Sequence, residues 1–187
     1  MIILVAIGLG LIIGWLRKGS LRRLASIDVA AIWIALLALL VRVVLDWGPA
    51  WGWDWVRGAQ LWLYGAVYAL LVLFLVANYR LPGFWLLALG ALMNLAVIAA
   101  NGGIMPVDAT GLGANLVHEL TSGQVVAHGL ISDQTKLKWL ADVILVPFPV
   151  PKRSSLGDLL MLAGLIYFLQ QAMQAQLSYR ITSLRQR

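Results

Sequence analysis

The sequence predicts an all-α, polytopic membrane protein: a helix bundle of about five transmembrane helices, with a long outer segment folded back over it as a cap. Only 12% of the 187 residues are charged and 61% are hydrophobic, whereas soluble domains carry about 25% charged residues. The apolar residues form five long runs, each close to the ~20 residues that cross a bilayer. A long polar segment, residues 101–155, separates the last two runs. We therefore expect a single membrane domain over residues 1–187, with the outer cap at 101–155.

The composition excludes several classes of protein. The chain has no cysteine, which rules out disulfides, thiolate metal sites and cysteine nucleophiles. Its net charge is +6, but the charged residues lie at the ends of the apolar runs, where they act as topology signals. We therefore expect the lipid bilayer as a partner and no nucleic acid.

The first expected span covers residues 2–16. No charged side chain precedes it and a basic cluster at residues 17–23 follows it, whereas a secretory signal carries its basic residues first. This order favours a retained helix with its N-terminus outside. Gly10 and Gly14 form a small-xxx-small face that permits close helix contact, although glycine is also simply tolerated in membrane helices.

The second expected span covers residues 26–47, with Ser26 as its N-cap and Asp28 in its first turn. Arg42 lies inside this apolar run, four residues before Asp46. One interpretation is an i,i+4 ion pair, with Arg42 extending to the outer surface. The other is a cation that faces the bundle interior and binds an anionic group, because charges within membranes are costly and often functional.

The remaining expected spans cover residues 59–77, 84–100 and 156–177. The loop before them, residues 46–58, holds four tryptophans, a composition typical of an interfacial belt; a platform for a pigment, a quinone or a lipid tail is the alternative. Asn94 lies inside a span, where it predicts either an interhelical hydrogen bond or a ligand contact.

The distribution of basic residues predicts the orientation. With the first connection inside, the inner segments hold eight of the fourteen basic residues, in agreement with the positive-inside rule for short loops. We expect a multi-pass protein of the bacterial cytoplasmic (inner) membrane, with its N-terminus outside and its C-terminus cytoplasmic.

The outer segment is expected to contain short helices and an extended stretch. Residues 112–120 predict one short helix. A second is predicted to begin at Ser132 and to lie in the membrane interface, with Lys136 and Lys138 on its polar side. The alternating prolines at residues 146–151 impose an extended path that folds back against the bundle. Four basic residues at the outer face could bind phosphate head groups: Lys136, Lys138, Lys152 and Arg153.

The polar motifs of this segment resemble those of an uncharacterised bacterial membrane family, domain of unknown function 5317. The motifs are Asn-Gly-Gly-x-Met-Pro (101–106), a histidine at 128, polar residues at 133–135, Leu-Ala-Asp (140–142), a proline run and Ser-x-Gly-Asp (155–158). The family pattern has Leu-Gly-Asp where this chain has Leu-Ala-Asp. The resemblance covers nearly the whole chain and implies the membrane fold without an activity. It indicates one polar site formed by Asn101, His128, Thr135, Asp142 and Asp158.

These polar residues could perform acid–base catalysis or bind a metal ion. Asp142 and Asp158 could share a proton and perform acid–base work, but both fall at expected helix ends, and Ser155 and Asp158 match a capping box. The histidines and acids have neither zinc nor calcium spacing. We therefore expect no metal and no cofactor, and we favour a protein without enzymatic activity.

Three functions stay open. The first is an accessory or structural subunit, or a binding component, of a larger membrane complex with other membrane protein subunits. The second is an outer-leaflet protein or enzyme that uses the polar site to bind a lipid or a quinone. The third is a small transporter or channel with Arg42 and Asn94 in its path, which the absence of an internal repeat disfavours.

Overall fold

The structure is a computed structural model that describes residues 2–111, 113–121, 128–147 and 151–174. Within these ranges the chain is mostly helical, which confirms the helical prediction. The long helices of the described chain are α1 (Ile2–Leu16), α3 (Ile32–Trp47), α4 (Trp55–Ala77), α5 (Phe84–Ala100) and α7 (Leu156–Gln174).

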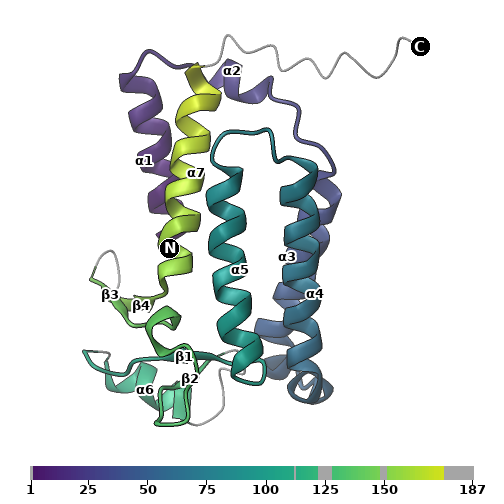
Figure 1. Cartoon of the computed structure of the whole chain (residues 1–187), viewed down its shortest axis with the longest axis vertical. Coiled ribbons are helices and arrows are strands. Elements are labelled where there is room, and N and C mark those ends of the chain that lie inside the picture. Colours follow the sequence, from purple (N-terminus) through teal and green to yellow (C-terminus); the bar gives the residue numbers. More distant parts are fainter. Residues whose placement is uncertain (1, 112, 122–127, 148–150, 175–187) are drawn as a thin grey trace.

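The long helices pack side by side in the order α1, α7, α5, α4, α3 (Figure 1). The short helix α2 (Leu21–Ala25) packs against α7 at the end of the molecule opposite the outer segment. Helices α5 and α7 are neighbours in space, although the outer segment separates them in sequence. That segment leaves the helical layer at the end of α5 and returns to it at the start of α7, which packs beside Gly90 and Asn94 of α5. Its side chains therefore lie over one end of the helices (Figure 1).

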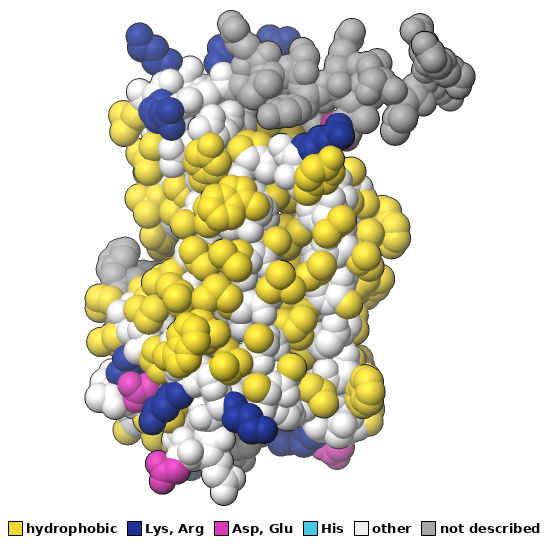
Figure 2. Space-filling view, viewed as in Figure 1, with side chains coloured by type: hydrophobic (Ala, Val, Ile, Leu, Met, Phe, Trp, Pro, Cys, Tyr) yellow, Lys and Arg dark blue, Asp and Glu magenta, His cyan; other side chains and the backbone are white. Residues whose placement is uncertain are grey.

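Length and composition identify the chain as a membrane protein. The stretches Ile32–Trp51, Trp55–Ala77 and Leu156–Gln174 are long and apolar enough to cross a membrane, and α1 and α5 are shorter apolar helices of 15 and 17 residues. Figure 2 shows a broad band of hydrophobic side chains between two charged ends. All nine tryptophans have more than 40% of their surface exposed, as expected of side chains that face lipid and its interface.

Several predicted boundaries are confirmed. The spans predicted at 2–16 and 84–100 coincide with α1 and α5. Helix α4 begins four residues earlier than the predicted 59–77, because a short 3-10 helix, η1 (Gly48–Trp51), follows α3 directly and shortens the loop. The predicted end of the last span, at residues 175–177, lies outside the described residues.

The predicted start of the second span is wrong. Ser26 ends α2 instead of capping α3, Asp28 lies in the connection between them, and α3 begins at Ile32. The buried side chain of Asn78 binds the backbone of Ala30 twice: its oxygen accepts from the N–H at 2.8 Å, and its amide donates to the carbonyl at 2.9 Å. Because both backbone groups of Ala30 are engaged, the connection stays outside the helix.

The outer segment contains short strands as well as a helix, so the all-α prediction is wrong there. Its described elements are β1 (Met105–Val107), α6 (Ala114–Thr121), β2 (His128–Leu130), β3 (Ile144–Val146) and β4 (Lys152–Ser154). Strands β1 and β2 pair in parallel, and β3 and β4 pair antiparallel. Helix α6 confirms the helix predicted at 112–120. Of the proline stretch, residues 148–150 lie outside the described chain, and its flanks are β3 and β4.

The interfacial helix predicted to begin at Ser132 is also wrong. Only a 3-10 turn, η2 (Lys138–Leu140), forms there, after Leu137 in a left-handed conformation (φ 52°). The backbone N–H of Asp142 then donates to the carbonyl of Pro106 beside β1. A sheet partner in another part of the chain thus replaces the local helical hydrogen bonds that the sequence pattern predicted.

Close contact between α5 and α7 depends on glycine. A Cβ atom on Gly90 would lie 2.3 Å from the carbonyl oxygen of Gly157, and a Cβ on Gly157 would lie 2.2 Å from Oδ1 of Asn94. On α1, Cβ atoms at Gly10 and Gly14 would similarly approach side chains of α7 at 2.9 and 2.6 Å. The small-residue face predicted on α1 is therefore a helix contact.

We expect the substitution Gly157→Ala to destabilise the protein by about 1–3 kcal/mol, because the added methyl group overlaps the carboxamide of Asn94. Gly65→Ala in α4 is the matched control, since nothing lies within 4 Å of a Cβ at that position. Thermal unfolding of both variants in detergent measures the difference. Equal stability of the two variants would contradict the close contact.

Candidate functional site

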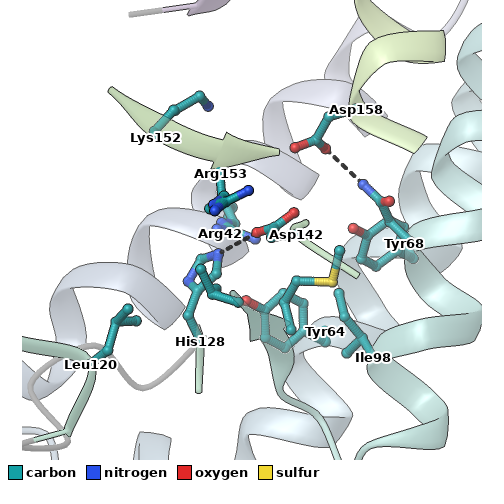
Figure 3. Close-up of a pocket in the computed structure, with 13 residues that line it drawn as sticks. Arg42, Tyr64, Tyr68, Ile98, Leu120, His128, Asp142, Lys152, Arg153 and Asp158 are labelled. Carbon is teal, nitrogen blue, oxygen red and sulfur yellow. Dashed lines mark hydrogen bonds and ion pairs between the residues drawn. The ribbon is translucent and has the colours of Figure 1, made fainter. Parts of the chain in front are cut away.

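A cavity of about 440 Å³ lies where the outer ends of the helices meet the outer segment (Figure 3). The helices contribute polar side chains from inside the spans, and the outer segment contributes side chains from its strands and loops. The lining residues are Arg42, Tyr64, Tyr68, Asn94, Ile98, Met105, Val107, Leu120, His128, Asp142, Lys152, Arg153 and Asp158. Residues far apart in the sequence thus meet at one place.

A hydrogen-bonded junction between α5 and α7 forms one wall of the cavity. The amide of Asn94 donates to Oδ1 of Asp158 at 2.8 Å, and the hydroxyl of Ser155 donates to Oδ1 of Asn94 at 2.8 Å. The same Ser155 oxygen accepts from the backbone N–H of Asp158 at 2.9 Å, as an N-cap does. The interhelical bond predicted for Asn94 is confirmed, and the carboxylate of Asp158 takes part in it.

Arg42 enters the cavity from α3. Its Nε donates to Oδ2 of Asp46 at 2.8 Å, so the predicted i,i+4 ion pair is present. The guanidinium also lies over the ring of Tyr64, 5.3 Å from its centroid, as a cation–π contact. Arg42 therefore pairs with an acid and faces the cavity at once. Tyr64 and Tyr68 are site residues that were not predicted, although their i,i+4 spacing in an apolar helix places both on one face.

Asp142 is the most deeply buried acid of the cavity. Its side chain is 9% exposed, its Oδ1 is buried without a hydrogen-bond partner in the described chain, and its Oδ2 lies 3.8 Å from Nε2 of His128. Burial and the nearby carboxylate of Asp158 raise the pKa of Asp142 to about 7. Burial, and then the charge of Arg42, lower the pKa of His128 to about 4. The histidine is therefore neutral at pH 7, and Asp142 exchanges a proton near that pH.

Strand β4 brings Lys152 and Arg153 to the rim. The guanidinium of Arg153 donates to the carbonyls of Val143 and Thr110 and lies 3.3 Å from a carboxylate oxygen of Asp108. Arg153 thus ties β4 to the rest of the outer segment. Lys152 is half-buried, and its ammonium makes no ion pair within 4 Å among the described residues.

Other residues predicted for the polar site lie elsewhere. The side chain of Asn101 binds the backbone N–H and carbonyl of Lys136 at 2.9 and 3.0 Å, which fixes the start of the outer segment. The hydroxyl oxygen of Thr135 accepts a hydrogen bond from the backbone N–H of Ser132, three residues earlier in the chain. Lys136 and Lys138 are exposed and outside the cavity. The structure brings together His128, Asp142 and Asp158 and separates them from Asn101 and Thr135.

The arrangement can receive groups of either charge. Arg42 and Lys152 offer cationic donors, and Asp142 and Asp158 offer acceptors. Among the described residues no three histidine or acidic side chains gather as metal ligands would. A half-protonated Asp142 beside a neutral imidazole can also accept or donate a proton.

Comparison with known proteins yields a family without an activity. Residues 26–170 match a family of unknown function (DUF5317). The match includes every cavity residue and leaves out all of α1, all of α2 and the last four described residues of α7. Neither a curated protein nor a solved structure matches the chain.

The pKa of Asp142 predicts a pH dependence of stability. Because the folded protein holds this proton more tightly than the unfolded chain, Asp142 favours folding at low pH and loses that contribution as the pH rises from about 4 to 7. Relative to Asp142→Asn, the wild type should lose up to about 4 kcal/mol over this range and nothing further above it.

Thermal unfolding of both proteins between pH 4 and 9 tests this. His128 acts in the opposite direction, since its lowered pKa removes stability as the pH falls from 6.5 to 4, but it is present in both proteins and cancels from the difference. A difference that stays constant with pH would refute the assignment.

Proposed function

The chain belongs to the DUF5317 family of unknown function, and we propose that it is a membrane protein that binds the polar head of an amphipathic molecule in its outer cavity. A lipid or a quinone is a molecule of this kind. The observation that carries the proposal is the unpartnered, buried oxygen of Asp142 in a cavity where Arg42, Lys152 and Asp158 converge. Buried polar atoms are almost always hydrogen-bonded, so a ligand or water must complete this one.

The depth of the cavity suits such a ligand. Arg42 lies five residues before Trp47, the first of the exposed tryptophans at the outer end, or about 8 Å along the helix axis. Asn94 lies six residues before the end of α5, about 9 Å deep by the same rise. These positions correspond to the boundary between head groups and acyl chains, where the tryptophans locate the membrane surface.

The apolar part of the lining supports the same proposal. Ile98, Met105, Val107 and Leu120 are all buried and all border the cavity. Ligand sites combine an apolar lining with a few polar groups, and the polar groups orient the ligand. A molecule with a polar head and an apolar stem matches both parts of this lining.

Binding is favoured over catalysis by how the site residues are used. The Ser155 hydroxyl donates to Asn94 and accepts from a backbone N–H, so it is not poised as a nucleophile. Asp158 is held by the same asparagine. These groups form a rigid wall, which is what a binding site requires.

An accessory subunit of a membrane complex is a second candidate. Helix α5 lies in the middle of the helical row, yet Trp85, Leu89 and Leu92 on it are 62%, 44% and 50% exposed. These residues are spaced for one helix face. A helix of a partner subunit could cover this face in place of lipid.

The orientation that we propose follows from the charged ends. The connection from α1 to α2, which holds the cations of residues 17–23, and the connection from α4 to α5, which holds Arg80, lie at the end of the helices opposite the outer segment (Figure 1), as the positive-inside rule requires of cytoplasmic loops. Five spans then cross the bacterial cytoplasmic membrane, with the N-terminus outside and the C-terminus cytoplasmic. Helix α1, about 22 Å long at 1.5 Å per residue, can span it with help from its flanking residues.

Native mass spectrometry of protein gently extracted from its membranes tests the binding proposal. We expect a retained small molecule on the wild type, and an approximately tenfold lower bound fraction on Arg42→Gln and Lys152→Gln, because each removes a charged hydrogen-bond donor. Lys136→Gln is the matched control, since Lys136 is exposed and lies outside the cavity.

Equal retention by all four proteins would contradict a site in this cavity. Co-purification of other membrane proteins in fixed stoichiometry, with no small molecule on the wild type, would favour the accessory subunit.

The natural lack of cysteine permits a direct test of orientation. Single cysteines at the exposed positions Gln134 and Arg22 are treated in intact cells with a membrane-impermeant maleimide. We expect labelling at 134, and labelling at 22 only after the cells are lysed. The reverse pattern would overturn the orientation.

A further inference from the structure

The ionisable side chains that lack an oppositely charged partner in the cavity carry charges of both signs. Arg42 is paired with Asp46, and Arg153 is paired with Asp108 and two backbone carbonyls. Lys152 makes no ion pair among the described residues, Asp158 accepts a hydrogen bond from the uncharged amide of Asn94, and Asp142 lies 3.8 Å from the imidazole of His128, which is neutral at pH 7. In Figure 3, Lys152 lies to the left and Asp158 to the right, with Asp142 below both and Arg42 to the left of Asp142. One side of the cavity therefore presents cations, and the other side presents carboxylates.

A donor that carries positive charge matches the two carboxylates. Asp142 is nine-tenths buried, and its Oδ1 has no hydrogen-bond partner in the described chain. Burial and the charge of Asp158 both oppose ionisation of Asp142, which is why its pKa is raised. A cation placed between the two carboxylates would relieve this repulsion and satisfy the free oxygen at the same time.

The donor must also carry hydrogen on its nitrogen. A primary ammonium offers three N–H donors, whereas a trimethylammonium offers none and is usually bound on aromatic faces. Of the two tyrosine rings that line the cavity, Tyr64 already has the guanidinium of Arg42 over it, which leaves Tyr68 as the aromatic face for a ligand. A primary ammonium therefore fits these walls better than a quaternary one.

The cationic side fits a phosphate. The ion pair between Arg42 and Asp46 uses Nε of the guanidinium, so the terminal nitrogens keep donors for an anion. Lys152 adds an ammonium that has no ion pair within 4 Å among the described residues. Arginine and lysine are the side chains that bind phosphate oxygens.

We propose that the ligand of this cavity is zwitterionic, a phosphodiester linked to a primary ammonium, with the ammonium held by Asp142 and Asp158 and the phosphodiester held by Lys152 and Arg42. This inference rests on the proposed function and names the head-group class. An ethanolamine phospholipid and free glycerophosphoethanolamine share this chemistry.

Competition binding to the purified, delipidated full-length protein tests the head group. Phospholipids with ethanolamine, choline and glycerol heads and identical acyl chains are offered in equal amounts, and the bound species are resolved by native mass spectrometry. We expect the ethanolamine lipid to exceed the choline lipid about tenfold, the effect of one charge-assisted hydrogen bond.

Two variants test which residues of the cavity recognise the head group. Asp142→Asn should remove the ethanolamine preference, whereas Lys152→Gln should weaken binding of the ethanolamine and the glycerol lipids alike. Asp133→Asn is the matched control, because Asp133 is exposed and outside the cavity. Thermal unfolding at pH 7 verifies that each variant is folded, and Asp142→Asn should be at least as stable as the wild type.

The outcomes separate the two proposals. Equal binding of the ethanolamine and choline lipids, or a preference that survives Asp142→Asn, overturns the zwitterionic head group, while a response to Lys152→Gln still supports a lipid site. Lipid binding that responds to no cavity variant overturns both. Glycerophosphoethanolamine offered alone identifies the source: we expect weaker binding than for the lipid, and equal binding would assign the soluble molecule while supporting the same head-group chemistry.

Discussion

The hydrogen-bonded junction of Asn94, Ser155 and Asp158 is the interaction on which the rest of the structure depends. It joins α5 and α7 at the point where the outer segment re-enters the helical layer, six residues before the end of α5. Gly157 makes room for it, since a Cβ there would meet the carboxamide of Asn94. A carboxylate and a carboxamide at this depth would be costly in an apolar environment without each other. Their pairing therefore fixes the contact of the two helices and forms one wall of the cavity with the same atoms.

The cavity follows from how the chain distributes its charges near the membrane surface. Arg42 and Arg153 are each neutralised within the protein, by Asp46 and by Asp108. Asp142 has no such cationic partner: β1 fixes its backbone in a buried position, its Oδ2 lies 3.8 Å from the neutral imidazole of His128, and its Oδ1, like Nε of Arg153, has no hydrogen-bond partner in the described chain. A protein that had only to fold could satisfy this atom with a neighbouring donor. An unsatisfied acceptor bordering a cavity is instead the feature that a ligand or an ordered water completes.

The sequence predicted the helices well because membrane spans are uniform apolar runs, and two of them match to the residue. It failed where a distant side chain decides the local structure: Asn78 holds Ala30 outside α3, and the outer segment pairs as strands instead of forming the helix expected from Ser132. For the site, the family resemblance indicated Asp142, Asp158 and His128, but the sequence could not reveal that Arg42 and Asn94 reach the same cavity from other helices. Asn101 and Thr135 looked equivalent in sequence, and they prove to bind backbone in turns.

The most direct measurement is an experimental density map of the protein in nanodiscs prepared from its native membrane. A ligand-binding cavity predicts non-protein density between Arg42, Asp142 and Asp158, with an atom within hydrogen-bonding distance of Oδ1 of Asp142. A cavity occupied by the protein's own side chains, with Oδ1 of Asp142 bonded to one of them, would contradict the account and leave these residues a structural role.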